Sequence, residues 1–513
     1  MKSISINNQL KAGAALNYII LILHTLVGLL YTPYMLRAMG QSEYGLYSLI
    51  ASVISYLTVL DLGMGNAIIR YTAKFRAEGK EKEQYEMFGM FLVLYAIIGL
   101  ITIIVGLCLY LNIDSMFGKT MTDVELGKAK IMMLILIFNL AFTFPMSIFS
   151  SIITAYEKFI FPRLVSIIRI ILNTVIMIVL LYWGYKAIAM VIVQTVFNVI
   201  TLTLNYFYCK YNIKIKVSFG HFNWIFLKEV AIYSLWIFLN VIIDKVYWST
   251  GQFVLGAVAG TVAVSVFAVA IQLETMYLSF STAISSVFLP KVTAMVTKDC
   301  SKEQLSSLFI RTGRIQYIIL CFILCGFVVF GRSFIRLWAG PDYDEAYIIT
   351  LLFFTSLLVP LIQNLGITIL QAKNQMKFRS LLYLGIAAIA LLFEIILAKK
   401  MGGIGCAIAI SGALVLGQGV IMNIYYSRKQ GINILSFWKE IIKMSIAPFV
   451  VSLISFFIVK TFIVDSWFKL ILLVIAYFVF YIPLFFRFSM NLEERDLILK
   501  PLSRLLQNDK DRR

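Results

Sequence analysis

The chain has 513 residues and is strongly apolar, with 61% hydrophobic residues, 14% charged residues and a mean hydropathy of +0.89. A soluble domain is about half apolar and about a quarter charged, so the composition excludes a soluble globular protein. The net charge of +19 comes from 45 Lys and Arg against 26 Asp and Glu. In a membrane protein this excess is expected from cytoplasmic loops and from contact with anionic lipids, so it does not indicate a nucleic-acid partner.

Fourteen apolar runs are long enough to cross a bilayer, which requires roughly 20 apolar residues per helix. In chain order these runs lie near residues 12–36, 44–67, 87–111, 131–153, 163–183, 187–208, 229–257, 261–290, 313–331, 346–371, 378–398, 402–426, 444–463 and 467–487. The sequence therefore predicts an all-α polytopic membrane protein with about 14 transmembrane helices.

The distribution of positive charge predicts the orientation of the chain. With an even number of spans, both termini lie on one side, and most of the 45 Lys and Arg fall in the termini and in the loops on that side. Short loops on the cytoplasmic side carry the excess of Lys and Arg. We therefore expect a multi-pass membrane protein with both termini in the cytoplasm. The first run lacks a small-residue cleavage site and is expected to be a retained helix.

An internal repeat links the two halves of the chain at an offset of 217 to 220 residues. It aligns residues 40–47 with 260–267, 155–161 with 372–378, and 184–189 with 402–407. Because an even number of spans separates the copies, they are parallel repeats, which in transporters rock against each other around a central site.

The repeat predicts three parts. Residues 1–210 form an N-lobe of six helices, residues 211–430 a C-lobe of six, and residues 431–513 an interfacial helix, helices 13 and 14 and a basic cytoplasmic tail. Amphipathic or basic stretches at 68–86, 432–442 and 491–508 are expected to lie on the cytoplasmic membrane surface.

Seven charged or titratable side chains lie in the interior of predicted spans, away from the span ends, where each costs at least a few kcal/mol unless it has a partner, a wet cavity or a function. They are His24, Asp61, Arg169, Asp244, Lys245, Glu274 and Glu394. His24 and Asp244 are separated by the repeat offset and occupy matching positions in the first helix of each lobe. They either line a central cavity from both sides or bond to a neighbouring helix.

Lys245 and Glu274 lie at similar depth in neighbouring antiparallel spans. They form either a structural ion pair or, for Lys245, a substrate contact. Arg169 lies one to two turns inside the cytoplasmic end of its span, where it either snorkels to the headgroups or binds a phosphate.

Three charged residues, Asp61 and Glu394 from this set and Arg70 outside it, are expected to have structural or gating roles. Asp61 precedes two glycines, which indicate a loosened helix end that its carboxylate tethers, and Arg70 follows nearby. Glu394 is close to two lysines near the outer face and is expected to snorkel to the interface.

Other chemistries lack their residues in this sequence. There is no Gly-x-x-x-x-Gly-Lys-Ser/Thr phosphate loop, and the two histidines are too few for a histidine metal site. Six cysteines carry no metal-ligand spacing. The loops are short for a membrane glycosyltransferase or polymerase, so we expect a protein that is not an enzyme and has no cofactor, with coupling to a proton or sodium gradient left open.

Several motifs resemble the bacterial polysaccharide repeat-unit flippases, which act on O-antigen, capsule or exopolysaccharide units. These flippases belong to the multidrug/oligosaccharidyl-lipid/polysaccharide (MOP) exporter superfamily. The motifs are Tyr34-Met-Leu-Arg-Ala-Met-Gly40, Glu43-Tyr-Gly-Leu-Tyr47, Asp61-Leu-Gly-Met-Gly-Asn-Ala67, Arg70-Tyr-Thr-Ala-Lys74, Tyr156-Glu-Lys-Phe159 and Gln371-Ala-Lys-Asn374. Asp244-Lys245 resembles the acidic-basic pair often found in the seventh span of the family. Val264-Ser-Val-Phe267 departs from the usual pattern, which weakens the second copy of the repeat.

The resemblance implies two six-helix lobes around a cavity that opens alternately to each side. The implied cargo is an undecaprenyl-diphosphate-linked oligosaccharide, with Arg169 and Lys245 near the diphosphate and His24, Asp244 and Glu274 lining the sugar cavity or coupling to ions. Implied partners are this lipid-linked substrate, anionic lipids, and the polysaccharide polymerase and chain-length machinery. Two alternatives from the same superfamily stay open: a cation-coupled exporter of small molecules and a flippase for a peptidoglycan or teichoic precursor.

Overall fold

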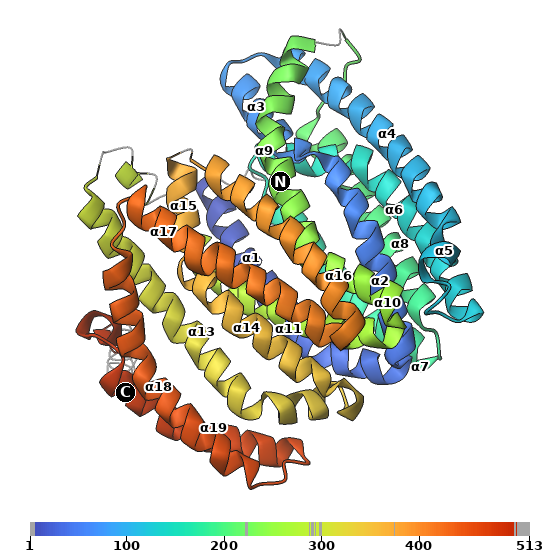
Figure 1. Cartoon of the computed structure of the whole chain (residues 1–513). Coiled ribbons are helices and arrows are strands. Elements are labelled where there is room, and N and C mark those ends of the chain that lie inside the picture. The colour runs from blue at the N-terminus through green and yellow to red at the C-terminus, as the bar shows by residue number, and fades with distance from the viewer. Residues whose placement is uncertain are drawn as a thin grey trace, which may run out of the picture. The chain divides into compact units, whose positions relative to one another are not determined.

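The computed structural model describes residues 6–220, 224–286, 288, 292, 294–296, 300–373, 375–496 and 499. Every regular element among these residues is helical, and no strand occurs in them. The first half contains α1 (Ile6–Met39), α2 (Gln41–Leu57), η1 (Thr58–Asp61), α3 (Met64–Ala77), α4 (Glu81–Leu111), α5 (Ile113–Phe117), α6 (Asp123–Ala155), α7 (Ile160–Tyr182), α8 (Ala187–Tyr208), η2 (Cys209–Ile213), α9 (Trp224–Trp248) and α10 (Thr250–Val258) (Figure 1).

The second half contains α11 (Gly260–Ser286), α13 (Lys302–Trp338), η3 (Pro341–Tyr343), α14 (Glu345–Ile362), α15 (Asn364–Ala372), α16 (Lys377–Leu414), η4 (Val415–Ile421), α17 (Met422–Arg428), α18 (Ile434–Lys460) and α19 (Trp467–Phe488). The elements η1 and η3 are 3-10 turns, and η2 and η4 are π-helical turns. The predicted all-α class is confirmed.

Twelve helical segments of the described residues are long and apolar enough to cross a membrane. One of them, 377–428, has 52 residues, about 78 Å as a straight helix and far more than a bilayer requires. Gly402 interrupts it with φ 56° and ψ −133°, between the two runs that the sequence separates at 398 and 402. A polytopic membrane protein is thus confirmed, and the exact number of 14 spans stays a prediction.

Two aligned glycine pairs of the sequence repeat adopt the same unusual backbone conformation. Gly40 and Gly260 both have φ 81°, Gly40 directly before α2 and Gly260 as the first residue of α11. Gly184 and Gly402, the second aligned pair, have φ 87° and 56°. A positive φ is readily adopted by glycine and seldom by other residues, so corresponding helix starts in the two copies require glycine for the same reason.

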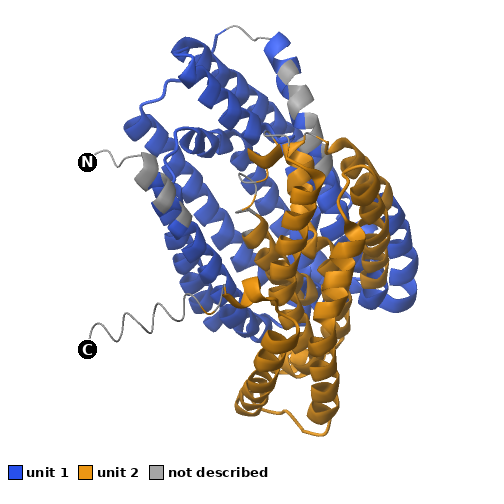
Figure 2. Cartoon of the chain, turned by 90° about the vertical axis from the view of Figure 1, so that its left-hand side faces the viewer, with its two compact units in different colours: residues 1–268, 387–406 blue, residues 269–386, 407–513 orange. Residues whose placement is uncertain are grey.

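The chain divides by packing into two compact units, residues 1–268 with 387–406 and residues 269–386 with 407–513 (Figure 2). The predicted lobes are a division by sequence repeat and stay a prediction. In unit 1, α4 and α8 pack against α6, and α1 packs against α7. Its core lies around Phe88, Tyr95 and Ile148, which are fully buried.

In unit 2, α13 packs along α14 and α18, and α18 packs along α19. Helix α13 begins with a capping box, in which the Ser301 hydroxyl accepts from the Gln304 amide and the Gln304 side chain accepts from the Ser301 amide. Phe309 on α13 and Phe437 on α18 are fully buried with their ring centroids 5.1 Å apart.

Two predicted surface helices are partly packed into protein. Residues 68–77 belong to α3, whose Ile68, Tyr71 and Thr72 are buried against α4 and α6. The apolar face of 432–442 holds the buried Phe437, which contacts α13. Part of each apolar face thus covers neighbouring helices, whereas Leu435 and Ile442 of the second stretch are exposed. The position of these stretches at the membrane surface stays a prediction. Of 491–508, residues 497, 498 and 500–508 lie outside the described residues.

Candidate functional site

Unit 1 contains a polar cavity of about 720 Å³ among α1, α6, α7 and α8. Its polar and basic lining consists of His24, Asn139, Arg163, Ser166, Arg169, Asn173, Thr174, Gln194 and Asn198. The remaining lining residues are Ile20, Val27 and Ile170. Polar side chains within apolar spans are costly unless they bond to each other, to water or to a ligand, so this cavity is the candidate site of unit 1.

The cavity is electropositive. Two arginines and a histidine line it, and none of its lining residues is acidic. Arg keeps its charge at any physiological pH and binds carboxylate or phosphate through two parallel N–H bonds. The lining therefore favours an anionic ligand with several hydrogen-bonding groups.

Helix α7 supplies half of the lining residues because of its helical spacing. Arg163, Ser166, Ile170, Asn173 and Thr174 follow each other at intervals of three, four, three and one, which places them on one face of the helix. The opposite face of α7 carries exposed apolar residues, among them Ile168, Leu172 and Val175. Such an amphipathic span presents its apolar face to lipid and its polar face to the cavity.

A chain of side-chain amides holds Arg169 in place. Its Nη1 lies 3.5 Å from the Oδ1 of Asn198 on α8. The Nδ2 of Asn198 donates to Oδ1 of Asn139 at 2.8 Å and to Oγ1 of Thr143 at 2.7 Å, both on α6. These hydrogen bonds thus link α6, α7 and α8 at the guanidinium of Arg169. Among the described residues no carboxylate forms an ion pair with this group, so it keeps its net positive charge.

Two other amides complete the wall. Gln194 on α8 donates to the hydroxyl of Tyr47 on α2 at 2.8 Å, which ties the cavity to the helix beside it. The Oδ1 of Asn173 is buried and has no hydrogen-bond partner among the described residues. A buried acceptor without a partner costs about 1–3 kcal/mol, so its place in the wall of a cavity calls for a ligand or water donor.

The structure brings two of the predicted substrate-binding residues, His24 and Arg169, to this one cavity. Asp244 and Lys245 lie on α9, with Asp244 exposed and Lys245 half-buried. Glu274 lies on α11 in the part that belongs to unit 2. It is buried, and its Oε1 has no hydrogen-bond partner in the described part of the chain. The pairing of Lys245 with Glu274 stays a prediction.

The loosened helix end at Asp61 is present in the structure. Asp61 ends the 3-10 turn η1, after which Leu62 and Gly63 have φ 53° and 71°. The hydroxyl of Tyr95 on α4 donates to Asp61 Oδ1 at 2.8 Å. Arg70 lies on the exposed side of α3, and its Cζ atom is 5.6 Å from the ring centroid of Tyr71. Asp61 thus joins the break between α2 and α3 to α4.

Glu394 does not snorkel as expected. Its exposed fraction is 0%, and neither carboxylate oxygen has a hydrogen-bond partner among the described residues, whereas Lys399 and Lys400 are exposed. The expectation failed because α16 turns this position toward protein rather than toward the membrane surface.

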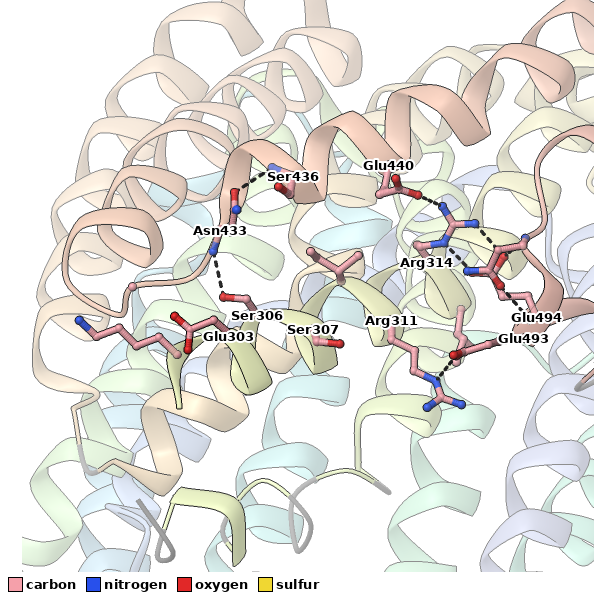
Figure 3. Close-up of a pocket in the computed structure, with 15 residues that line it drawn as sticks. Glu303, Ser306, Ser307, Arg311, Arg314, Asn433, Ser436, Glu440, Glu493 and Glu494 are labelled. Carbon is pink, nitrogen blue, oxygen red and sulfur yellow. Dashed lines mark hydrogen bonds and ion pairs between the residues drawn. The ribbon is translucent and has the colours of Figure 1, made fainter. Parts of the chain in front are cut away.

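A second polar cavity, of about 650 Å³, lies in unit 2 where α13, α18 and residues 491–494 meet (Figure 3). At its wall, the guanidinium of Arg314 donates to both carboxylate oxygens of Glu494, at 2.6 and 2.8 Å, and to Glu440 at 2.5 Å. Arg314 and Glu494 are buried, whereas the neighbouring pair Arg311 and Glu493 is exposed. Because its charges are paired internally, this cluster is suited to joining segments of the chain.

Sequence reasoning missed Arg163, Asn139, Asn173, Gln194 and Asn198. Arg163 was overlooked because it is the first residue of its predicted span, where a charge is unremarkable. The amides were overlooked because the search was restricted to ionisable residues, although an amide also has a smaller cost in an apolar span. The periodic polar face of α7 was the available signal, since Arg163, Ser166 and Asn173 follow helical spacing within an otherwise apolar run.

A family model described as "Polysaccharide biosynthesis protein" matches residues 34–348, more than half of the chain. The chain belongs to this family. A Shigella flexneri protein named "Putative O-antigen transporter" is 21% identical over 416 residues, which cover 78% of this chain and 94% of that protein. The predicted place of the chain among polysaccharide biosynthesis proteins is confirmed.

Solved structures of flippases and transporters share the fold. The lipid II flippase MurJ, in an inward closed conformation, superposes with a TM-score of 0.73 at 18% identity, covering 95% of this chain and 99% of that one. An inward-facing multidrug resistance MATE family transporter gives 0.61 at 15% identity, covering 82% and 99%. These relatives are named as transporters or flippases, in agreement with the expectation of a protein that is not an enzyme.

Proposed function

We propose that this polysaccharide biosynthesis protein is a flippase. It moves undecaprenyl-diphosphate-linked oligosaccharide repeat units from the cytoplasmic to the outer leaflet of the plasma membrane, by alternating access of two lobes. The basic cavity of unit 1, with Arg163 and Arg169 and no acidic lining residue, is the single observation that best supports this cargo. The family match supports the same role in polysaccharide assembly.

The physical task explains the cavity. An uncatalysed crossing would carry a charged diphosphate and many hydroxyl groups through hydrocarbon, where an unpaired charge costs tens of kcal/mol in the Born limit. Arginine side chains would bind the diphosphate through charge-assisted hydrogen bonds, and the neutral amides would replace water around the sugars. The polyprenyl tail would stay in the bilayer throughout.

We also propose that transport is driven by a proton or sodium gradient and that both termini are cytoplasmic. Glu274 and Glu394 are buried carboxyl groups with oxygens that lack hydrogen-bond partners among the described residues, which suits groups that take up and release a cation. Abolishing transport by collapsing either gradient would identify the coupling ion, and a transport rate that ignores both gradients would contradict the coupling.

The same chemistry separates this proposal from its alternatives. A cationic drug would meet two arginines and no carboxylate in the unit 1 cavity, so an exporter of cationic compounds is disfavoured. A flippase for a peptidoglycan or teichoic precursor would share the diphosphate or phosphate chemistry. The mass of the lipid that depends on the protein distinguishes these cargoes.

Deleting the gene and analysing total lipid by mass spectrometry tests the proposal. We expect an undecaprenyl-diphosphate oligosaccharide to accumulate and surface polysaccharide to be lost. Expression of the parent protein should restore the normal lipid profile and the surface polysaccharide. An Arg311→Met control, altered at an exposed side chain of unit 2, should do the same, whereas Arg169→Met should not. An unchanged lipid profile with new sensitivity to drugs or dyes would contradict the flippase and favour an exporter.

A further inference from the structure

The polar face of α7 changes its hydrogen-bonding character along the helix. Arg163 and Arg169 offer only N–H donors, and between them Ser166 donates its hydroxyl hydrogen to the carbonyl of Pro162 at 2.8 Å. Beyond Arg169, the face continues with Asn173 and Thr174. Asn173 follows Arg169 by four residues, so the two side chains are neighbours on the helix surface, with Asn173 about 6 Å further along the axis.

The far part of this face presents acceptors to the cavity. The hydroxyl of Thr174 donates to the carbonyl of Ile170 at 2.8 Å, so its hydrogen is used within α7 and its oxygen remains an acceptor. The Oδ1 of Asn173 is buried without a hydrogen-bond partner among the described residues. A group that supplies O–H or N–H donors satisfies these two oxygens, and its own oxygens can accept from the side-chain NH2 of Asn173.

The order of donors and acceptors matches one kind of ligand. A phosphate accepts hydrogen bonds and has none to donate when fully ionised, whereas a sugar carries hydroxyl or acetamido N–H donors. A phosphate bound by Arg169 therefore leaves the sugar attached to it beside Asn173 and Thr174.

We propose that Asn173 and Thr174 form a subsite for the first sugar of the cargo, the one joined to the diphosphate. This inference rests on the proposed flippase function and deepens it. It assigns recognition of the phosphate to the arginines and recognition of the adjoining sugar to two neutral residues one turn beyond Arg169. The subsite selects for a sugar that directs hydrogen-bond donors toward α7.

Binding of two synthetic probes to the purified full chain tests the subsite. One probe is geranyl diphosphate, and the other is geranyl diphosphate joined to N-acetylglucosamine. We expect the parent to prefer the sugar-bearing probe by about five- to tenfold. Asn173→Leu and Thr174→Val should each reduce this preference without weakening geranyl diphosphate. Thr174→Val keeps the side-chain shape, so it serves where Asn173→Leu fails to fold.

Two controls separate the subsite from the wider function. Arg169→Met should weaken both probes together, and Val175→Leu, on the exposed apolar face of α7, should weaken neither. If the Asn173 and Thr174 variants keep the full preference while Arg169→Met weakens both probes, the subsite is refuted and the flippase proposal stands. If the parent binds neither probe, both are refuted.

Discussion

Asn198 donates one amide hydrogen to Asn139 at 2.8 Å and the other to Thr143 at 2.7 Å. Because both hydrogens are used, the carbonyl oxygen of Asn198 must point the other way, where Nη1 of Arg169 lies 3.5 Å away. An amide at this position orients the guanidinium and leaves its charge uncompensated. A carboxylate would pair with that charge and compete with an anionic ligand.

Replacing Asn198 with aspartate should therefore impair transport without unfolding the protein. Asn198→Asp places a negative charge beside Arg169, and a charge-assisted bond worth about 1.5–3 kcal/mol would have to be broken by the cargo. We expect binding of a diphosphate probe to weaken at least about tenfold. The control is Val196→Leu on the exposed side of α8. Unchanged affinity in Asn198→Asp would contradict the role assigned to Arg169.

The buried ion pair of unit 2 should be much more important for stability than its exposed neighbour. Arg314→Met leaves Glu494 buried without its partner, and breaking a buried pair in this way costs about 3–5 kcal/mol. Arg311→Met removes one partner of the pair with Glu493, whose two side chains are 53% and 69% exposed. Such an exposed pair contributes less than about 1 kcal/mol to stability. Thermal unfolding in detergent measures both, and equal melting temperatures for the two variants would contradict this account.

Gly45 allows α2 to approach the first turn of α11 within unit 1. A Cβ atom at Gly45 would lie 1.8 Å from the carbonyl oxygen of Thr261, so the two helices would have to separate. We expect Gly45→Ala to lower stability by about 1–3 kcal/mol, as overpacking does. Gly127→Ala is the matched control, because a Cβ there meets nothing within 4 Å. If Gly45→Ala unfolds at the same temperature as the parent, the close approach of α2 and α11 does not contribute to stability.

Asp344, between α13 and α14, should give a stability that depends on acid pH. The hydrogen bond from Arg332, followed by that from Arg336, lowers the pKa of Asp344 to about 2. The stabilisation is fully present above the unfolded pKa of about 3.9 and is lost as the pH falls through the folded pKa.

Asp344→Asn should therefore be less stable than the parent by at most about 1 kcal/mol at neutral pH, because the group is partly exposed. The difference in melting temperature should stay constant from pH 7 to pH 5 and shrink below about pH 4. A difference that instead grows as the pH falls would contradict the assignment of this ion pair.

The helices and their apolar faces could be predicted from sequence because hydrophobic runs of span length have few alternatives. The break at Gly402 was also visible, as a gap between two runs. What the sequence could not decide was the partner of each face. Phe437 has the same amphipathic setting whether it faces lipid or, as here, Phe309 on α13, so the sequence did not show that this side chain is buried in protein.

The charged residues show the same limit. Arg169 and His24 stood out as charged or titratable groups within apolar runs, and both line the cavity. Asn198 and Asn173 were missed because neutral amides carry a weaker signal. The buried pair of Arg314 and Glu494 was not foreseen, because the two residues lie 180 residues apart in sequence. Long-range pairing is set by the fold and is not visible in local composition.

The most direct test of the flippase proposal is transport by the purified protein in liposomes. A lipid-diphosphate oligosaccharide would be placed in both leaflets, and a glycosidase that cannot cross the membrane would digest the outward-facing sugars. We predict that protein-containing liposomes lose nearly all the sugar, whereas empty liposomes and Arg169→Met liposomes retain about half. Retention of half of the sugar with the folded parent protein, under both a proton and a sodium gradient, would contradict the account.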